Sequence, residues 1–328
     1  MSDLIRWGIL GTARINRALI PAIRASTRNR LVAIASRTPA RAKNYAKKWG
    51  IDQYYGSYQT LLDNPEIDAV YISLPNHLHA EWAIKAAQSH KHVLCEKPLA
   101  LSPDEINAII IAARKNNVFI SEGFMYRHHP QTKIIQSLVK SGKLGNIQHI
   151  DGCFSIILEH PDDYRWKPEF GGGSIWDLGC YPVSFMRMLV GKNPDEVFGQ
   201  SVLAPTNVDL TFVGQMKFDN QITAQFYCSF GLPFRTKIEI MGSKGSLFVA
   251  RPFKPEDFAP VKFVDANGNE ELIRCDYPDL YLGEVEDLSN AILFNQKQLI
   301  PLEESLQINQ ILYGLIQSSK IKSQVKLH

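Results

Sequence analysis

The sequence has few cysteines, little net charge and no long apolar run. Its five cysteines lie far apart with no C-x-x-C pair, and its nine histidines have no metal-ligand spacing, so neither a disulfide framework nor a metal site is predicted. The 36 basic and 33 acidic side chains leave a net charge of only +3, which argues against a nucleic-acid-binding surface. The apolar segment at residues 106–113 is far shorter than the roughly 20 residues that span a bilayer.

What is present is the composition of a globular protein of about two domains. The chain has 328 residues, of which 45% are apolar and 21% charged, and domains of roughly 100 to 200 residues are usual. The first residues have neither the apolar centre nor the cleavage site of a signal peptide. We therefore expect a cytoplasmic enzyme or binding protein, with reduced and buried cysteines and no nucleic-acid or membrane partner.

Residues 1–123 have the pattern of a doubly wound Rossmann domain. Short β-branched or apolar runs alternate with segments of helical period, which indicates β-α-β units and a parallel sheet buried on both faces. Thr38 and Pro39 have the sequence of a helix start, an N-cap followed by proline at the first helical position. Strands are expected at residues 4–10, 31–36, 69–73, 92–95 and 118–123, and helices at 14–26, 39–49, 79–89 and 103–116.

Residues 124–328 are predicted to form a second, α+β domain. Strands are expected at residues 147–157, 211–218, 221–230, 236–241 and 246–250, and helices at 173–190, 281–295 and 302–320. The predicted fold class is therefore α/β: an N-terminal doubly wound parallel sheet, then an α+β domain with a large open, mostly antiparallel sheet. A broad half-apolar sheet face is an association patch, so we expect a homodimer or a tetramer through this sheet.

The first predicted strand ends in a turn that partly matches the dinucleotide-binding fingerprint G-x-G-x-x-G. Gly11 holds its place, whereas Ala13 and Asn16 replace the second and third glycines. The helix that follows offers free N–H groups and a positive dipole end to an anion. An ordinary strand-to-helix turn is the alternative interpretation. If the turn binds a dinucleotide, its contacts come from Gly11, Thr12, Ala13, Arg14 and Ile15.

The end of the second predicted strand bears on the choice between NAD and NADP. At this place an NAD site has an acidic residue for the ribose 2′-hydroxyl, whereas a basic group accepts a 2′-phosphate. The sequence has Ser36 and Arg37 here, with Arg41 one helical turn on, and no acid. A guanidinium pairs bidentately with a phosphate, so we predict NADP rather than NAD. The alternative is that both arginines are solvated residues at a helix start.

Two further polar segments follow predicted strands, at residues 73–79 (SLPNHLH) and 95–98 (CEKP). Ligands of doubly wound sheets bind at the carboxyl ends of the strands. A lysine between Glu96 and Pro98 at such an end is therefore a candidate for the active site, although a solvated surface turn is the alternative. His77 and His79 fit a structural role as well as a cofactor-lining one.

Five motifs follow one another in a fixed order along nearly the whole chain. They are G-x-A-x-I at residues 11–15, P-N-x-x-H at 75–79, E-K-P at 96–98, G-F-M-Y-R at 123–127 and G-G-G-S-x-x-D-x-G-x-Y at 171–181. This order resembles the glucose-fructose oxidoreductase, inositol dehydrogenase and MocA (Gfo/Idh/MocA) family. It is most similar to the NADP-dependent branch of D-xylose 1-dehydrogenases, trans-dihydrodiol dehydrogenases and keto-sugar reductases. Inositol-type members have histidine in place of Tyr181, which favours the aldose or dihydrodiol branch.

The resemblance implies an NADP-dependent enzyme that acts on CH–OH groups of a small polyhydroxylated substrate. It implies that Lys97 reaches into the active site beside the nicotinamide and that a cis peptide bond precedes Pro98. It also implies that Asn76 and nearby residues hold the cofactor's ribose and nicotinamide. The cofactor set in these two segments is Leu74, Pro75, Asn76, His79, Glu96 and Lys97.

Oxidation of a sugar carbon needs a base for the hydroxyl proton and a donor at the oxygen. In this interpretation Tyr181 is the base, and the Lys97 ammonium lowers its pKa from the usual value of about 10. Asp177 lies four residues before Tyr181, a spacing that places both on one helix face. It would orient the substrate or Lys97, and the alternative is a carboxylate paired with a surface cation. The glycines at residues 171–173 indicate close approach of a ligand or of another chain segment.

The candidate substrate contacts are Arg127, Tyr164, Arg165 and Trp166, because aromatic faces and guanidinium groups suit a polyhydroxylated ring, although such residues also pack in ordinary loops. The leading prediction is a dehydrogenase that transfers a hydride between NADP and a small sugar or cyclic diol. The alternatives are a keto-sugar reductase that runs in the opposite direction and a nicotinamide-dependent glycosidase. A non-enzymatic ligand sensor is disfavoured by the intact set of Lys97, Asp177 and Tyr181.

Overall fold

The computed structural model describes residues 4–219, 221–256 and 260–327, and the chain divides into two compact units. Unit 1 comprises residues 1–125 and 281–306, and unit 2 comprises residues 126–280 and 307–328. The domain boundary expected at residue 123 lies two residues before the first of these divisions.

Residues 281–306 differ from the prediction, which places them in the second domain. They belong to unit 1 because helix α8 (Leu282–Phe294) supplies part of that unit's core. Val285 and Leu288 of α8 are fully buried in the same hydrophobic cluster as Trp7 and Leu19. An amphipathic helix that covers a distant sheet has no local signal of its destination in the sequence.

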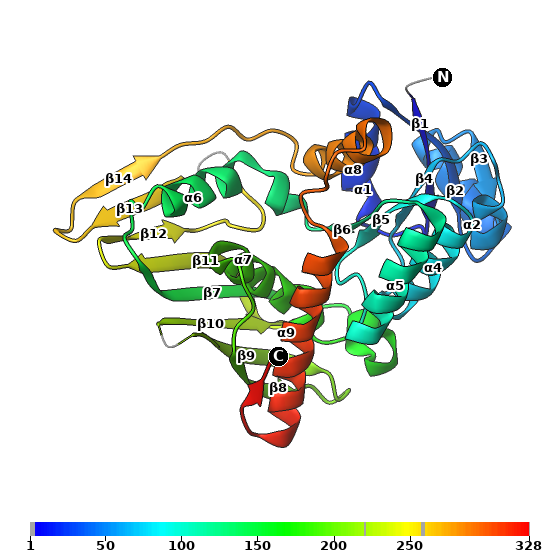
Figure 1. Ribbon diagram of the computed structural model, residues 1–328. Coiled ribbons are helices and arrows are strands. Elements are labelled where there is room, and N and C mark those ends of the chain that lie inside the picture. Colours follow the sequence, from blue (N-terminus) through cyan, green and yellow to red (C-terminus); the bar gives the residue numbers. More distant parts are fainter. Residues whose placement is uncertain (1–3, 220, 257–259, 328) are drawn as a thin grey trace. The chain divides into compact units, whose positions relative to one another are not determined.

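Unit 1 is built on six parallel strands in the order β3-β2-β1-β4-β5-β6, shown in blue and cyan in Figure 1. Separate hydrophobic clusters form on the two faces of the sheet: Ala83 of α4 and Ile109 of α5 lie in one, and Leu19 of α1 lies in the other. The predicted doubly wound sheet is therefore confirmed. The strands are β1 (Ile5–Leu10), β2 (Asn29–Ala35), β3 (Gln53–Tyr55), β4 (Ala69–Ile72), β5 (His92–Glu96) and β6 (Ile120–Gly123), and the helices besides α8 are α1 (Asn16–Ala25), α2 (Pro39–Trp49), α3 (Tyr58–Leu62), α4 (His79–Gln88) and α5 (Pro103–Asn116).

The helix ends of unit 1 follow local sequence signals where those signals are strong. Thr38 Oγ1 accepts the Arg41 N–H, and Pro39 begins α2 as predicted. Ser102 caps α5 in the same way, since its Oγ accepts the Glu105 N–H. Strand β3 and helix α3 are missing from the prediction because they are too short to have a clear hydrophobic period.

Unit 2 is built on a nine-stranded mixed sheet in the order β14-β13-β12-β11-β7-β10-β9-β8-β15. Strands β7 and β10 are parallel and the other neighbouring pairs are antiparallel, which confirms the mostly antiparallel sheet. Strands β8, β13, β14 and β15 and helix α6 are additions to the prediction. The elements are β7 (Ile147–Ile157), β8 (Glu196–Leu203), β9 (Asp209–Phe218), β10 (Ile222–Ser229), β11 (Gly231–Gly242), β12 (Gly245–Val249), β13 (Val261–Asp265), β14 (Glu270–Ile273), β15 (Val325–Lys326), α6 (Pro130–Lys140), α7 (Cys180–Val190) and α9 (Leu302–Ile321), whose residues from 307 onward belong to this unit.

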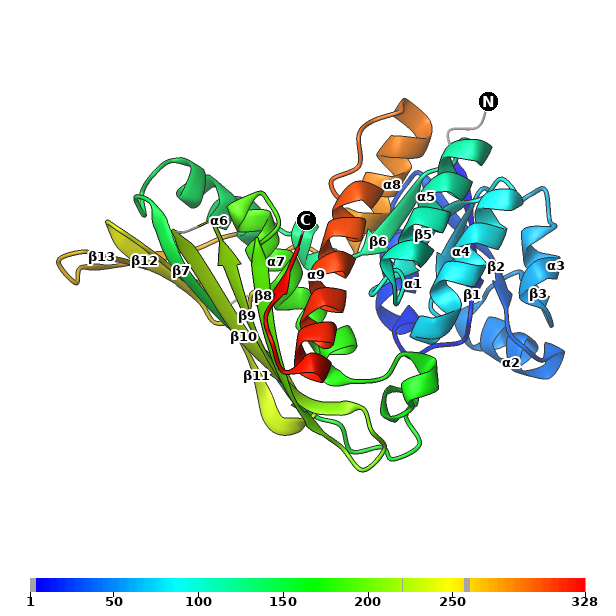
Figure 2. The same ribbon diagram turned by 60° about the horizontal axis from the view of Figure 1, so that its bottom comes forward.

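The two faces of this large sheet differ in what covers them. Figure 2 shows helices α6, α7 and α9 on one face, and no helix of the described residues covers the other. Strand β9 has the corresponding alternation: Phe212 and Met216 are buried, whereas Val213, Gln215 and Lys217 are exposed. The uncovered face therefore presents a mixture of apolar and polar side chains.

Candidate functional site

Two side chains hold the turn after β1 by hydrogen bonds to its backbone carbonyls. Asn16, at the third glycine position, is fully buried, and its Nδ2 donates to the Gly11 carbonyl oxygen at 2.9 Å. Tyr45 Oη donates to the Ala13 carbonyl oxygen at 3.1 Å. Gly11 has a φ of +108°, and a Cβ there would lie 3.0 Å from the Ser73 carbonyl oxygen. The first glycine of the fingerprint is thus required, and asparagine closes the turn in place of the third.

The carboxyl end of β2 presents two cations. Arg37 and Arg41 are exposed, and neither makes an ion pair with another described residue. Burial raises the pKa of the Tyr58 phenol, while the charges of Arg37 and Arg41 lower it, so both guanidinium groups lie within electrostatic reach of Tyr58. Ser36, the residue before them, is buried. An uncommitted pair of guanidinium groups at a strand end is suited to an anion.

The loops that follow β4 and β5 are joined by His79, the first residue of α4. Its Nε2 lies 2.7 Å from the Leu74 carbonyl oxygen and its Nδ1 lies 2.8 Å from the Pro98 carbonyl oxygen. His79 is only 1% exposed, and burial lowers its pKa. The sequence leaves its role open, and this placement favours the structural one, because both ring nitrogens face backbone carbonyls.

The loop after β5 has the cis peptide bond that the family resemblance implies. The bond joins Lys97 to Pro98. Before it, Glu96 Oε1 accepts a hydrogen bond of 2.5 Å from Tyr71 Oη, inside unit 1. Burial and the Glu96 charge raise the pKa of Tyr71 well above its usual value, so the phenol remains a donor. The structure thus brings the turn of Gly11, the Leu74 loop and the Lys97 loop to one edge of the sheet, where doubly wound sheets bind ligands.

In unit 2, Asp177 and Tyr181 lie on a helical segment that begins as a π-helix. The π-helix, η5, comprises Ile175–Gly179, and α7 follows from Cys180. The α-helix expected from residue 173 is therefore wrong in its first part, since Gly173 has a φ of +112°, which lies outside any helix. Single π turns occur frequently at functional sites.

Two other segments of the chain approach the glycine run that precedes η5. A Cβ on Gly172 would lie 2.4 Å from the Arg165 carbonyl oxygen, and a Cβ on Gly173 would lie 2.1 Å from Asp209 Oδ1. Asp209 Oδ2 accepts the Ser174 hydroxyl at 2.6 Å and the Ile175 N–H at 2.7 Å. Of the two explanations that the sequence leaves open for this run, contact with the chain accounts for both glycines.

Asp177 is paired with a cation. Its Oδ2 accepts a hydrogen bond of 2.8 Å from Arg165 Nε, and Arg165 Nη1 also lies 3.1 Å from Asp163 Oδ1. Asp177 is only 6% exposed. The sequence leaves open that Asp177 pairs with a surface cation instead of a ligand. The structure has such an ion pair, but its cation, Arg165, is half-buried rather than on the surface.

Three other predicted substrate contacts lie in unit 2. Tyr164 lies beneath the Arg165 guanidinium, with its ring centre 4.7 Å from Cζ. Trp166 Nε1 donates to the His160 carbonyl oxygen at 3.0 Å, and its ring packs edge-on against Phe230. Arg127 is buried, at 5% exposure. Trp166 and Arg165 therefore both make contacts with other residues of unit 2, as residues of an ordinary loop also do.

Tyr181 lies in an aromatic cluster on the helix side of the large sheet. Its ring centre is 5.3 Å from that of Phe154, 5.4 Å from that of Phe253 and 6.0 Å from that of Tyr126. Tyr126 Oη donates to Ser184 Oγ at 3.0 Å, which anchors the cluster to α7. This packing fixes the direction of the Tyr181 ring.

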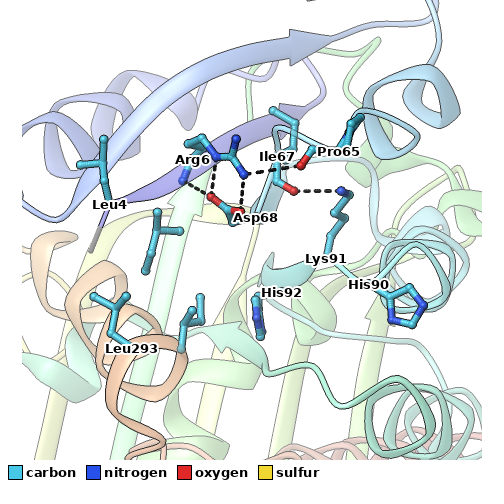
Figure 3. Close-up of a pocket in the computed structure, with 11 residues that line it drawn as sticks. Leu4, Arg6, Pro65, Ile67, Asp68, His90, Lys91, His92 and Leu293 are labelled. Carbon is cyan, nitrogen blue, oxygen red and sulfur yellow. Dashed lines mark hydrogen bonds and ion pairs between the residues drawn. The ribbon is translucent and has the colours of Figure 1, made fainter. Parts of the chain in front are cut away.

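A cavity of about 370 Å³ lies at the opposite, amino end of the strands of unit 1 (Figure 3). Its charges are satisfied internally: Arg6 forms a bidentate pair with Asp68, at 2.8 and 2.9 Å, and Lys91 Nζ donates to the Asn64 and Ile67 carbonyl oxygens. Burial lowers the pKa of His92 to about 4, so this ring is neutral and accepts the Phe119 N–H. We assign no ligand to this cavity.

All five cysteines are free, as expected, and four of them are buried, whereas Cys275 is partly exposed. Within residues 4–219, 221–256 and 260–327, no group of three or more His, Cys, Asp or Glu side chains is arranged to hold a metal ion. No helix among those same residues has the length and apolar character needed to cross a membrane.

Comparison with known proteins gives matches along nearly the whole chain. Residues 5–124 match a family described as "Oxidoreductase family, NAD-binding Rossmann fold", and residues 132–248 match the "GFO/IDH/MocA C-terminal domain". An uncharacterised oxidoreductase of Rhizobium meliloti, ORF334, is 37% identical over 97% of this chain and 98% of its own. D-xylose 1-dehydrogenase (NADP(+)) 2 of Haloferax volcanii is 36% identical over 98% of this chain and 99% of its own.

A solved structure has the same fold. The 3-ketoreductase KijD10 of Actinomadura kijaniata, in complex with NADP and TDP-benzene, aligns with a TM-score of 0.90 and 27% identity over 96% of this chain and 98% of its own. The names of the D-xylose 1-dehydrogenase and the 3-ketoreductase agree with the branch that the five motifs indicate. The chain therefore belongs to the GFO/IDH/MocA family of oxidoreductases.

Proposed function

We propose that this protein is an NADP-dependent oxidoreductase that transfers a hydride between NADP(H) and a carbon of a small sugar or cyclic diol. The observation that carries the proposal is the similarity, over nearly the full length of both chains, to a D-xylose 1-dehydrogenase whose name specifies NADP. The NADP complex of the related 3-ketoreductase supports the same cofactor.

Unit 1 has features that fit a dinucleotide phosphate. The positive φ of Gly11 keeps the turn after β1 free of a Cβ, and Arg37 and Arg41 are exposed cations at the end of β2. His79 supports the loops behind the site. The proposed cofactor contacts are Gly11, Thr12, Ala13, Arg14, Ile15, Ser36, Arg37, Arg41, Leu74, Pro75, Asn76, Glu96 and Lys97.

Arg37 is expected to select NADP over NAD. Arg37→Ala should raise KM for NADP about ten- to hundredfold, because a charge-assisted hydrogen bond contributes roughly 1.5 to 3 kcal/mol. KM for NAD should change little. Arg30→Ala is the matched control, since Arg30 lies at the amino end of the same strand and pairs with Asp52 at the surface. Equal effects of Arg37→Ala on both cofactors would contradict the assignment.

Lys97 and Tyr181 are assigned separate roles at the reacting oxygen. The chemistry supplied by a bound nicotinamide is acceptance or donation of a hydride. The Lys97 ammonium donates a hydrogen bond to the substrate oxygen and stabilises negative charge there. Tyr181 Oη takes the hydroxyl proton during oxidation and returns it during reduction. The aromatic cluster around Tyr181 holds its ring in a single direction for this transfer.

Asp177 is proposed to support the site through Arg165. The bond from Arg165 Nε to Asp177 Oδ2 joins η5 to the loop that contains Tyr164 and Trp166. This ion pair can hold that loop in place for the substrate. The proposed substrate contacts are Arg127, Tyr164, Arg165 and Trp166.

Reduction of NADP and NAD by the purified protein over a panel of aldoses, inositols and cyclic diols tests the function. We expect turnover with an aldose or a diol and with NADP. The related 3-ketoreductase favours one second candidate, a keto-sugar reductase, which NADPH oxidation by keto-sugars would reveal. Release of free sugar from a glycoside without net NADP reduction would instead indicate a nicotinamide-dependent glycosidase.

The uncovered face of the large sheet is the proposed contact between copies of the chain. Val213 of β9 lies opposite Tyr227 of β10 on this face, and Phe248 of β12 is also exposed there. A mixed apolar surface of this kind favours a homodimer or a tetramer. Light scattering that shows only monomer at micromolar concentration would contradict this. The free cysteines suit the reducing cytoplasm, which is the proposed compartment.

A further inference from the structure

A buried carboxyl group holds the segment from Lys97 to Leu99 from inside unit 1. Glu122 Oε1 accepts the Leu99 N–H at 2.9 Å, two residues after Lys97. Glu122 is only 4% exposed and lies on β6, opposite Cys95 of β5. With His79 at the Pro98 carbonyl oxygen, the loop is held at two successive residues.

Fold stability does not explain a carboxyl group at this position. The hydrophobic cluster on this face of the sheet includes Cys95, Leu99 and Ile120, and burial of an ionisable group there is unfavourable. A glutamine could accept the same Leu99 N–H without that penalty. The hydrogen bond alone therefore does not explain why this residue is a glutamate, and the negative charge of its carboxyl group does need an explanation.

The charged and titratable groups around Glu122 come from three neighbouring elements. Burial raises the pKa of Glu122 to about 7, the Ser305 hydroxyl, the Leu99 N–H and the Lys97 ammonium lower it, and Glu304 raises it. The thiol of Cys95 has a pKa well above its usual value, so it remains neutral. The Leu99 N–H bond places the Glu122 carboxyl group two residues from Lys97, and the Lys97 charge favours ionised Glu122. The effect is reciprocal, because a negative Glu122 favours the protonated Lys97.

We propose that Glu122 is a positioning residue for Lys97, which holds the loop through the Leu99 N–H and keeps the Lys97 side chain cationic. The inference rests on the proposed function, in which Lys97 acts as a cationic donor at the substrate oxygen. It adds a second residue to that function, one that touches neither substrate nor cofactor.

The reactivity of Lys97 toward acetic anhydride tests this on the full-length protein without cofactor. Labelling is read by mass spectrometry of the Lys97 peptide, with exposed Lys115 as the internal standard. Only the neutral amine reacts, so Glu122→Gln should increase Lys97 labelling at pH 8 by about three- to tenfold. The matched control is Glu105→Gln. Glu105 Oε2 accepts the N–H of Leu101 at 2.8 Å, so it holds the same loop two residues after Leu99. This control should label like the unmodified protein.

Unchanged labelling of Lys97 in Glu122→Gln would overturn the proposal. An equal increase in Glu105→Gln would also overturn it, because that result would indicate a general loosening of the loop. If Glu122→Gln does not fold, the unmodified protein still decides: the labelling of Lys97 relative to Lys115 should fall as Glu122 ionises near pH 7. A constant ratio would contradict the proposal.

Kinetics separate this proposal from the proposed function. Glu122→Gln should lower kcat at neutral pH and change KM for NADP much less, since the proposed cofactor contacts other than Lys97 are intact. Labelling can change as expected while neither the unmodified protein nor any variant reduces NADP with an aldose or a diol. In that case the proposed function fails, but the role of Glu122 toward Lys97 is still supported.

Discussion

Lys97→Ala should lower kcat for sugar or diol oxidation by about 10²- to 10⁴-fold while NADPH binding remains measurable. A donor aimed at the developing charge on oxygen contributes an effect of this size, and alanine removes both its charge and its hydrogen bond. The loop itself should persist, because His79 and Glu122 bind the backbone at Pro98 and Leu99 rather than the lysine side chain. Steady-state kinetics and NADPH fluorescence measure the two quantities separately.

The matched control is Lys115→Ala, which removes an exposed lysine of α5 from the same unit. It should leave kcat and NADPH binding unchanged. Retained activity in Lys97→Ala would contradict the proposed role of Lys97. Loss of NADPH binding together with activity would assign Lys97 to cofactor binding instead of chemistry.

Local signals in the sequence predicted the frame of unit 1. The capping pair at Thr38 and Pro39 and the helix at residues 103–116 are predictable because they depend on neighbouring residues alone. The parallel sheet follows from apolar strands that alternate with helices. The sequence prediction misassigns helix α8 because its destination depends on tertiary packing in the hydrophobic cluster that includes Trp7, more than 270 residues away in the chain.

The candidate site was predictable to a different degree. Motif order nominates Lys97, Asp177 and Tyr181 as candidate site residues, and the missing acid after β2 nominates Arg37; these assignments remain predictions. The residues that hold the backbone around these candidates have no such signal: Asn16, Glu122 and Asp209 make hydrogen bonds with residues 5 to 34 positions away in the chain. Asparagine at the third glycine position is the one mark in the sequence that could have indicated that the turn is closed by a side chain.

The glycine run shows how one pattern can have two physical explanations. Glycine permits close approach of any atom, so the sequence cannot distinguish a ligand from the chain itself. The structure identifies the neighbour of Gly173 as Asp209 of β9, whose Oδ1 lies 2.1 Å from the position of a Cβ. The run is therefore a structural requirement of unit 2.

Gly173→Ala should destabilise the protein by about 3 to 5 kcal/mol, measured as a lower midpoint of urea unfolding. The φ of +112° is unfavourable for alanine by roughly 1 to 3 kcal/mol. The new Cβ must also displace Asp209, and this disrupts its buried hydrogen bonds with the Ser174 hydroxyl and the Ile175 N–H. Each buried polar group left without a partner contributes about 1 to 3 kcal/mol.

Gly191→Ala is the control that isolates the backbone contribution. Gly191 ends α7 with a φ of +80°, and, apart from its own neighbours along the chain, no atom of the described residues lies within 4 Å of its Cβ position. It should therefore lower stability by only about 1 kcal/mol. The double variant Gly173→Ala with Asp209→Ala tests the steric cause, because removal of the carboxylate should make the added methyl group nearly as mild as in Gly191→Ala. Equal effects of Gly173→Ala with and without Asp209 would show that strain of the backbone alone, rather than the contact with β9, requires glycine at this position.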